Sequence, residues 1–168
     1  LDALFVQSGV ADCAQLDKIY GPQVQSRKTD YDFLTNTVRF FKRLGCTSSD
    51  VFFKAAQYAH AIKPSAESAN GCAEMAYNKG DFNKTIEYYK EAVSLATSDT
   101  EAADFLYKVA VIYNAKFDNS IKSREFARLS IERDPNKGAP YILIGLLYAN
   151  TRGIYDSATL NKTVYWVA

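Results

Sequence analysis

The chain has 168 residues, of which 48% are hydrophobic, so it is long enough to bury a sizeable core. Its 20 Lys and Arg residues nearly balance 19 Asp and Glu residues, which argues against binding to nucleic acid or an anionic membrane, because both need clustered basic charge. No apolar stretch approaches the roughly 20 residues that span a bilayer, and a chain that begins at Leu1 is interpreted as a piece of a longer or processed protein.

The spacing of apolar residues predicts an all-α fold. Only four prolines and eight glycines interrupt the chain, and apolar residues recur at three- and four-residue intervals through most of it. A leading helix is expected over about residues 10–20, ended by Gly21 and Pro22. We expect eight or nine helices in a single domain over residues 1–168. After the leading helix they are expected at about 30–44, 48–62, 66–79, 82–96, 100–116, 121–133, 138–150 and 156–167.

Turn and capping residues mark the boundaries between these helices. Gly80 and Asp81 lie where one helix ends and the next is capped. Asp99 and Thr100 are expected to cap the helix that follows. Ala110 provides a small side chain in that helix, where the two helices of one hairpin cross closely. The pattern therefore indicates pairs of antiparallel helices.

The segment after Pro135 carries the most specific motif. Tyr141, Ile144, Gly145 and Tyr148 have the spacing of the first helix of a tetratricopeptide repeat. The chain resembles the tetratricopeptide-repeat family over about 29–149, by recurrence at roughly 33 to 38 residues. The repeat-like units are expected at about 29–64, 66–98, 100–136 and 138–168. The resemblance implies a right-handed solenoid of helical hairpins, and a generic antiparallel helical bundle is the alternative.

The resemblance also implies a binding groove, because the first helices of successive hairpins line a concave face in this family. Such a groove would be basic at one end, amide and aromatic in the middle and apolar at the other, which suits an extended peptide with an acidic end and an apolar end. The alternatives are solvated helix faces and packing against the next hairpin. The expected groove residues are Arg39, Lys42, Arg43, Asn70, Glu74, Tyr77, Asn78, Asp104, Tyr107, Val111, Asn114, Ile142, Leu146 and Asn150.

The inventory of reactive groups favours a binding protein over an enzyme. His60 is the only histidine, so a Cys-His or Ser-His pair would depend on it. The sequence has no Gly-rich phosphate loop and no Cys-x-x-Cys, so no cofactor or metal is expected. We expect a non-enzymatic scaffold for a protein or extended peptide. The alternatives are a structural or assembly segment whose ends stack on neighbouring domains, and a degenerate enzyme domain built around His60.

Two of the three cysteines are expected to form a disulfide. If the leading helix and the next helix run antiparallel, the start of one lies beside the end of the other, which brings Cys13 to Cys46. Cys72 is expected to stay a small buried hydrophobic residue. A disulfide would favour a periplasmic or cell-surface protein, in line with a resemblance to secreted bacterial repeat proteins. Two reduced thiols in a cytoplasmic protein are the alternative.

The last expected helix, at about 156–167, carries Val164, Tyr165 and Trp166. A solenoid needs a polar terminal helix for solubility, so an apolar terminal helix is expected to be covered. The cover would be a further repeat or a second copy of the chain.

Overall fold

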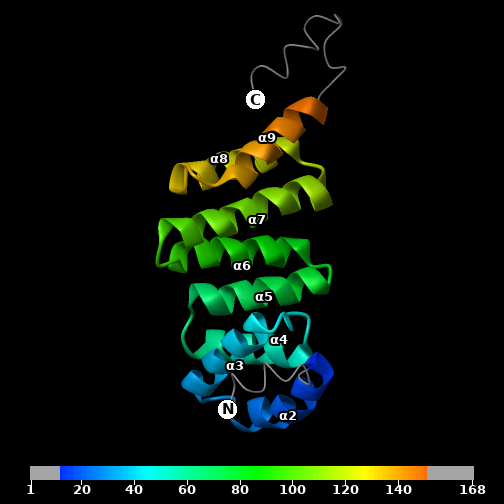
Figure 1. Cartoon of the computed structure of the whole chain (residues 1–168), viewed down its shortest axis with the longest axis vertical. Helices are drawn as coiled ribbons and strands as arrows, with labels where there is room; N and C mark the ends of the chain where they lie inside the picture. The colour runs from blue at the N-terminus through cyan, green and yellow to red at the C-terminus, as the bar shows by residue number, and fades with distance from the viewer. Residues whose placement is uncertain (1–11, 151–168) are drawn as a thin grey trace, which may run out of the picture. The chain divides into compact units, whose positions relative to one another are not determined.

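The computed structural model of the chain describes residues 12–150, and within them all regular secondary structure is α-helical, with no strand (Figure 1). This confirms the predicted all-α fold. None of the helices in this range is long and apolar enough to cross a membrane. The helices are α2 (Cys13–Ser26), α3 (Tyr31–Arg43), α4 (Asp50–Ile62), α5 (Ala66–Asn78), α6 (Phe82–Leu95), α7 (Asp99–Phe117), α8 (Ser120–Arg133) and α9 (Gly138–Asn150).

The chain divides into two compact units, Leu1–Leu95 and Ala96–Ala168. Unit 1 contains α2 to α6, and its helices pack as α3 on α4, α4 on α5 and α5 on α6 (Figure 1). Unit 2 contains α7 to α9, which pack as α7 on α8 and α8 on α9. In both units, helices that follow one another from α3 to α6 and from α7 to α9 thus pack together, as the sequence predicts for helical hairpins. The expected organisation as one domain stays a prediction, and the helix expected at about 156–167 lies outside the described residues.

The helix ends agree with the sequence from α3 onwards, where each lies within two residues of its expected position. Gly45 and Gly80 adopt left-handed φ angles of 74° and 77° after α3 and α5, a conformation that glycine adopts without steric cost. Asp81 then accepts a hydrogen bond from the backbone N–H of Lys84 (3.1 Å) at the start of α6. The turn predicted at Gly80 and Asp81 is confirmed.

One cap is corrected by the structure. Ser98, rather than Asp99 or Thr100, caps α7, because its side chain accepts from the backbone N–H of Glu101 at 3.2 Å. Asp99 lies in the first turn of α7 and pairs instead with Arg133 of α8, at 3.0 Å. Ser98, Asp99 and Thr100 are all residue types that cap helices, so the sequence signal is ambiguous. The extended backbone of Ser98 identifies it as the capping residue.

The leading helix differs from its prediction. α2 does not end at Gly21 and Pro22 but continues through them to Ser26. A proline inside a helix costs about 3 kcal/mol, because it removes one hydrogen bond and crowds the preceding turn. Here the continuous helix buries Leu16 and Val24 against the rest of unit 1, with exposed fractions of 0% and 1%. The prediction was wrong because it weighed Pro22 by local propensity alone. Helix α2 packs on α4, and Tyr58 of α4 donates a hydrogen bond to Gln25 in the second half of α2, at 3.0 Å.

The disulfide joins Cys13, the first residue of α2, to Cys46, which follows the Gly45 turn after α3. Their Cα atoms are 5.5 Å apart, within the usual range for a disulfide. Asp17 of α2 also accepts a hydrogen bond from Ser49, the residue that caps α4. These two links fasten the beginning of α2 to the connection between α3 and α4.

Small residues allow close helix contacts in both units. Gly71 of α5 lies so close to α4 that an added Cβ would be 2.5 Å from the Cβ of Ala56. In unit 2, Ala110 of α7 and Ala127 of α8 are both fully buried in one cluster with α9. Ser130, another buried residue of α8, donates a hydrogen bond to the carbonyl oxygen of Ala103 in α7, at 2.7 Å. The predicted role of Ala110 as a small packing residue therefore fits the structure.

Candidate functional site

The residues expected to line the groove lie on four helices. Those of unit 1 are on α3 and α5, and those of unit 2 are on α7 and α9. Helices α3 and α5 contact each other in unit 1, as α7 and α9 do in unit 2. Each unit therefore presents its own part of the expected surface. That the two parts form one groove stays a prediction.

The three cations of α3 are exposed, but they differ in their surroundings. Arg39 donates from Nε to the carboxylate of Glu67 on α5, at 2.9 Å. The guanidinium of Arg43 lies 5.6 Å from the ring centroid of Phe40, and Lys42 is exposed beside it. The ion pair offsets the charge of Arg39 and connects the two helices. Lys42 and Arg43 therefore dominate the positive potential of this surface.

The residues of α5 lie at different depths. Asn70 is buried and donates from its amide to Glu74, at 3.1 Å, so both groups serve a contact within the helix. Tyr77 is 40% exposed and its ring meets that of Phe82 edge-on, with centroids 5.4 Å apart. Asn78 is exposed. The amide and aromatic part of the expected site thus reaches the surface through Tyr77 and Asn78.

Unit 2 exposes aliphatic side chains on α7 and α9, the helices expected to line the groove. Val111 of α7 is 37% exposed, and Ile142 and Leu146 of α9 are 66% and 56% exposed. Ile142 and Leu146 are one helical turn apart, so they share one face of α9. We call these three residues the apolar face of unit 2. Asn150, which was expected to follow them, has no described side chain.

The other expected residues of unit 2 are half-buried: Asp104, Tyr107 and Asn114, all on α7. Asp104 forms an ion pair with Lys137, which precedes α9. That pair ties the start of α9 to α7 and places charge rather than apolar surface there. The apolar character of this end of the predicted groove therefore rests on Val111, Ile142 and Leu146.

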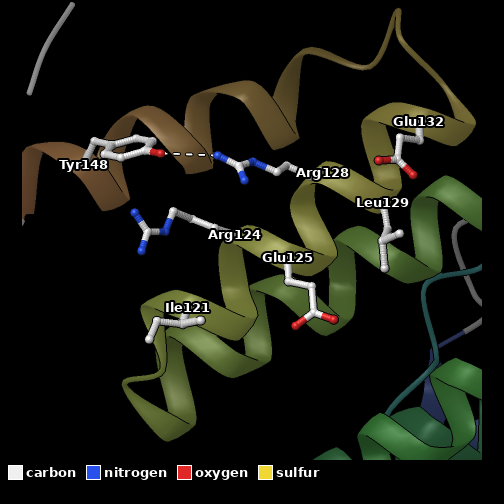
Figure 2. Close-up of a pocket in the computed structure, with 7 residues that line it drawn as sticks. All are labelled: Ile121, Arg124, Glu125, Arg128, Leu129, Glu132 and Tyr148. Atoms are coloured by element: carbon white, nitrogen blue, oxygen red, sulfur yellow. Dashed lines mark hydrogen bonds between the residues drawn. The ribbon is translucent and has the colours of Figure 1, made fainter. Parts of the chain in front are cut away.

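A pocket of about 490 Å³, which was not predicted from the sequence, lies between α8 and α9 (Figure 2). Arg128 donates to the hydroxyl of Tyr148 at 3.3 Å, and the guanidinium of Arg124 lies 4.9 Å from the centroid of the same ring. The other lining residues are Ile121, Glu125, Leu129 and Glu132, all from α8. The spacing of Arg124 and Arg128 by one helical turn is the signal that could have indicated it.

A second, smaller pocket of about 320 Å³ lies between α2 and α3 in unit 1. Arg27 lies over the ring of Phe33, 3.9 Å from its centroid, and pairs with Asp30 at 2.6 Å. The backbone N–H of Phe33 and the Arg27 side chain both donate to Asp30, which lowers the pKa of that carboxyl below its usual value. These groups serve the cap of α3, since Asp30 is its N-terminal capping residue.

The environment of His60 bears on the enzyme hypothesis. Its Nδ1 lies 3.1 Å from the hydroxyl of Ser68, and its Nε2 lies 3.4 Å from the carboxylate of Glu91. This is superficially a Ser-His-Glu arrangement. However, Ser68 is 2% exposed, and its hydroxyl already accepts from the backbone N–H of Ser65 and donates to the Ser65 carbonyl. The three groups connect α4, α5 and α6, which is a structural role, and the Ser68 oxygen is not presented to a substrate.

Cys72 has the properties of a buried, unreactive thiol. It is 1% exposed in α5, and burial, with the nearby carboxylate of Glu91 as a smaller cause, raises the pKa of the thiol from 9.0 to about 11. Burial also raises the pKa of Tyr88 and Tyr89 in the neighbouring α6. Among the described residues, no group of three or more His, Cys, Asp and Glu side chains is placed to hold a metal ion.

The raised pKa of Cys72 predicts that the protein loses stability at alkaline pH. Between about pH 9 and pH 11 the folded chain keeps a proton on Cys72 that the unfolded chain releases, so the free energy of unfolding falls as pH rises. We expect Cys72→Ala to lose less stability than the parent chain over this range, as measured by urea unfolding. Tyr88 and Tyr89 leave a residual slope in both proteins. Equal slopes would contradict the assignment.

Comparison with known proteins gives a partial match. No family model matches the chain. The chain is similar to the photosystem I assembly protein Ycf3 of Synechococcus, with 30% identity over 49% of this chain and 51% of that protein. It is also similar to the proteins of the same name from two strains of Prochlorococcus marinus, with 29% and 27% identity over 54% of this chain and 53% of each relative. The chain spans about half the length of these relatives. The similarity and the helical hairpins together support the resemblance to tetratricopeptide-repeat proteins.

Proposed function

We propose that the chain is a non-enzymatic scaffold that binds a protein or an extended peptide on the first helices of its hairpins. The observation that carries the proposal is the apolar face of unit 2, where three aliphatic side chains on α7 and α9 stay exposed. Exposed apolar side chains that lie together often mark interaction sites, and the two helices that carry these residues contact each other. The similarity to proteins named for assembly is consistent with a binding role.

The partner is proposed to contribute an apolar stretch to unit 2 and an acidic stretch to unit 1. Lys42 and Arg43 on α3 present exposed cations that attract an acidic segment. Val111, Ile142 and Leu146 remove apolar side chains from water when they are covered. The alternative, an assembly segment whose surfaces are covered by neighbouring domains of a longer protein, would use the same side chains within one chain.

A peptide-display selection on the full chain tests the proposed function. Peptides enriched on the chain are synthesised, and their dissociation constants are measured by fluorescence anisotropy. We expect Ile142→Asp with Leu146→Asp to weaken binding by about 1–3 kcal/mol, since two apolar contacts are replaced by desolvated charges. Ile19→Asp, at an exposed isoleucine of α2, is the matched control and should leave affinity unchanged. Equal losses in both variants would argue against the apolar face as the binding site.

Reversal of the three cations of α3 tests the proposed contact between unit 1 and the acidic stretch of the partner. Arg39→Glu, Lys42→Glu and Arg43→Glu together should slow association with an acidic peptide and remove the decrease of its on-rate with rising salt, because the attraction that salt screens is gone. Lys42→Glu with Arg43→Glu should produce most of the effect, because Arg39 is already paired with Glu67. Stopped-flow fluorescence at two salt concentrations measures both quantities. An unchanged on-rate and salt slope would refute this role.

The disulfide also supports a proposed location. We infer that the chain works in an oxidising compartment, such as the periplasm or the cell surface, because disulfides persist there and are reduced in the cytosol. Alkylation of thiols in intact cells, followed by mass analysis of the recovered chain, tests this. Free thiols at Cys13 and Cys46 in living cells would place the chain in a reducing compartment.

A further inference from the structure

We propose that the pocket between α8 and α9 is a second docking site, which binds an amphipathic helix of a partner protein with acidic residues along one edge and basic residues along the other. The site is separate from the apolar face of unit 2. On α9, Tyr148 points about 200° around the helix from Leu146, at 100° per residue. The inference therefore goes beyond the proposed function, because one unit would hold two segments at once.

The pocket is an elongated surface along α8. Its lining residues run from Ile121 to Glu132, which is about 16 Å at 1.5 Å per residue. That length matches about three turns of a helix lying parallel to α8. Ile121 is 74% exposed, which leaves an apolar side chain for the occupant to cover. A helix in a groove is a common mode of peptide recognition.

Three of the four charged side chains that line the pocket differ in their position across α8, and the fourth, Glu132, lies in its last turn. Arg124 and Arg128 lie on the edge of α8 that meets Tyr148 of α9, whereas Glu125 lies on the far edge (Figure 2). An occupant helix therefore meets cations on its side next to α9 and an anion on its other side. Complementary charges on the two edges of the occupant would be acidic and basic, respectively.

Tyr148 holds the two arginines in place before any partner binds. Arg124 lies against its ring and Arg128 donates to its hydroxyl. A guanidinium has five N–H donors, so Arg128 keeps donors for a carboxylate while it holds the tyrosine oxygen. Side chains that are already ordered lose less entropy when they bind. The tyrosine ring also lines the pocket, as Ile121 and Leu129 do.

The probe is a dye-labelled synthetic helix of about three turns, with an apolar stripe, two glutamates on one edge and two lysines on the other. A second peptide carries glutamine at all four charged positions. Against the full chain, we expect the charged peptide to bind about tenfold more tightly, since exposed charge pairs contribute a few tenths of a kcal/mol to 1 kcal/mol each. Anisotropy titrations at low and high salt measure the difference.

Charge reversal in the protein separates recognition from a structural role. Arg124→Glu with Arg128→Glu should abolish the preference for the charged peptide. Adding Glu125→Lys should restore part of it, because the far edge is then basic and the same helix can bind with its direction reversed. Circular dichroism checks that both variants stay helical. Ile142→Asp with Leu146→Asp should leave binding of this peptide unchanged, so a failure of the proposed function is distinguished from a failure here.

Three results would overturn the proposal. The first is equal binding of the charged and glutamine peptides to the parent chain. The second is no binding of either peptide, as expected if the pocket is already filled. The third is a dimer, seen by light scattering, that dissociates when Arg124 and Arg128 are reversed, which would assign the pocket to a second copy of the chain.

Discussion

Replacing Cys13 and Cys46 by serine lowers the free energy of unfolding by about 3–4 kcal/mol, the value expected for cross-linking residues 33 positions apart. The bridge restricts the unfolded chain and also fastens α2, which contacts α4 and buries only Leu16 and Val24 within its own length. Without the bridge, we expect α2 to detach before the remaining helices unfold. Urea unfolding followed by circular dichroism measures the total loss, and amide hydrogen exchange measures the protection of α2.

Cys72→Ser is the matched control, because it replaces the remaining cysteine without touching the bridge. It should leave the hydrogen-exchange protection of α2 equal to that of α3. If the double variant kept α2 protected, the contact with α4 would be sufficient and the bridge would not fasten the helix. Alkylation and mass analysis of the parent chain without reductant supply the direct check: a single reactive thiol after unfolding is expected, and three would refute the bridge.

The outcome for α2 shows where sequence reasoning is limited. The other helix ends were predictable because they depend on local signals, such as the glycine of a left-handed turn or the capping side chain of Ser65 at the start of α5. Pro22 is also a local signal, but the free energy that keeps α2 continuous comes from burial of Leu16 and Val24 against residues distant in sequence. In such cases the free energy of tertiary packing exceeds the cost in helix propensity.

The helices that carry the expected groove residues were predictable from the sequence, but the contacts of those residues were not. Repeat spacing placed Arg39 and Asn70 on first helices, and it placed Ile142 at an exposed position, where the structure has it. It could not show that Arg39 pairs with Glu67 or that Asn70 turns inward to Glu74, because those contacts depend on rotamers and on the depth of each helix. The pocket between α8 and α9 was missed for the same reason, since it depends on residues 20 positions apart meeting at Tyr148.

Replacing Gly71 by alanine is expected to destabilise unit 1 by about 1–2 kcal/mol, although alanine favours the helix by about 1 kcal/mol over glycine. The added Cβ would lie 2.5 Å from the Cβ of Ala56, far inside ordinary contact distance, and 3.8 Å from Phe52 Cζ. Ala56 and Phe52 are fully buried, so α4 and α5 must move apart. Gly71→Val should cost more. Chemical unfolding measures both changes.

Gly145→Ala, in α9, is the control, because a Cβ added to Gly145 would meet nothing within 4 Å. It should stabilise the chain by up to about 1 kcal/mol through helix propensity alone. Ala56→Gly then tests the specific contact: in a double-mutant cycle with Gly71→Ala, the two changes should couple favourably by about 1 kcal/mol or more, because one methyl group replaces the other in the same space. If Gly71→Ala instead stabilised the chain as much as Gly145→Ala, the close approach of α4 and α5 would not exist, and the need for glycine at this position would have another cause.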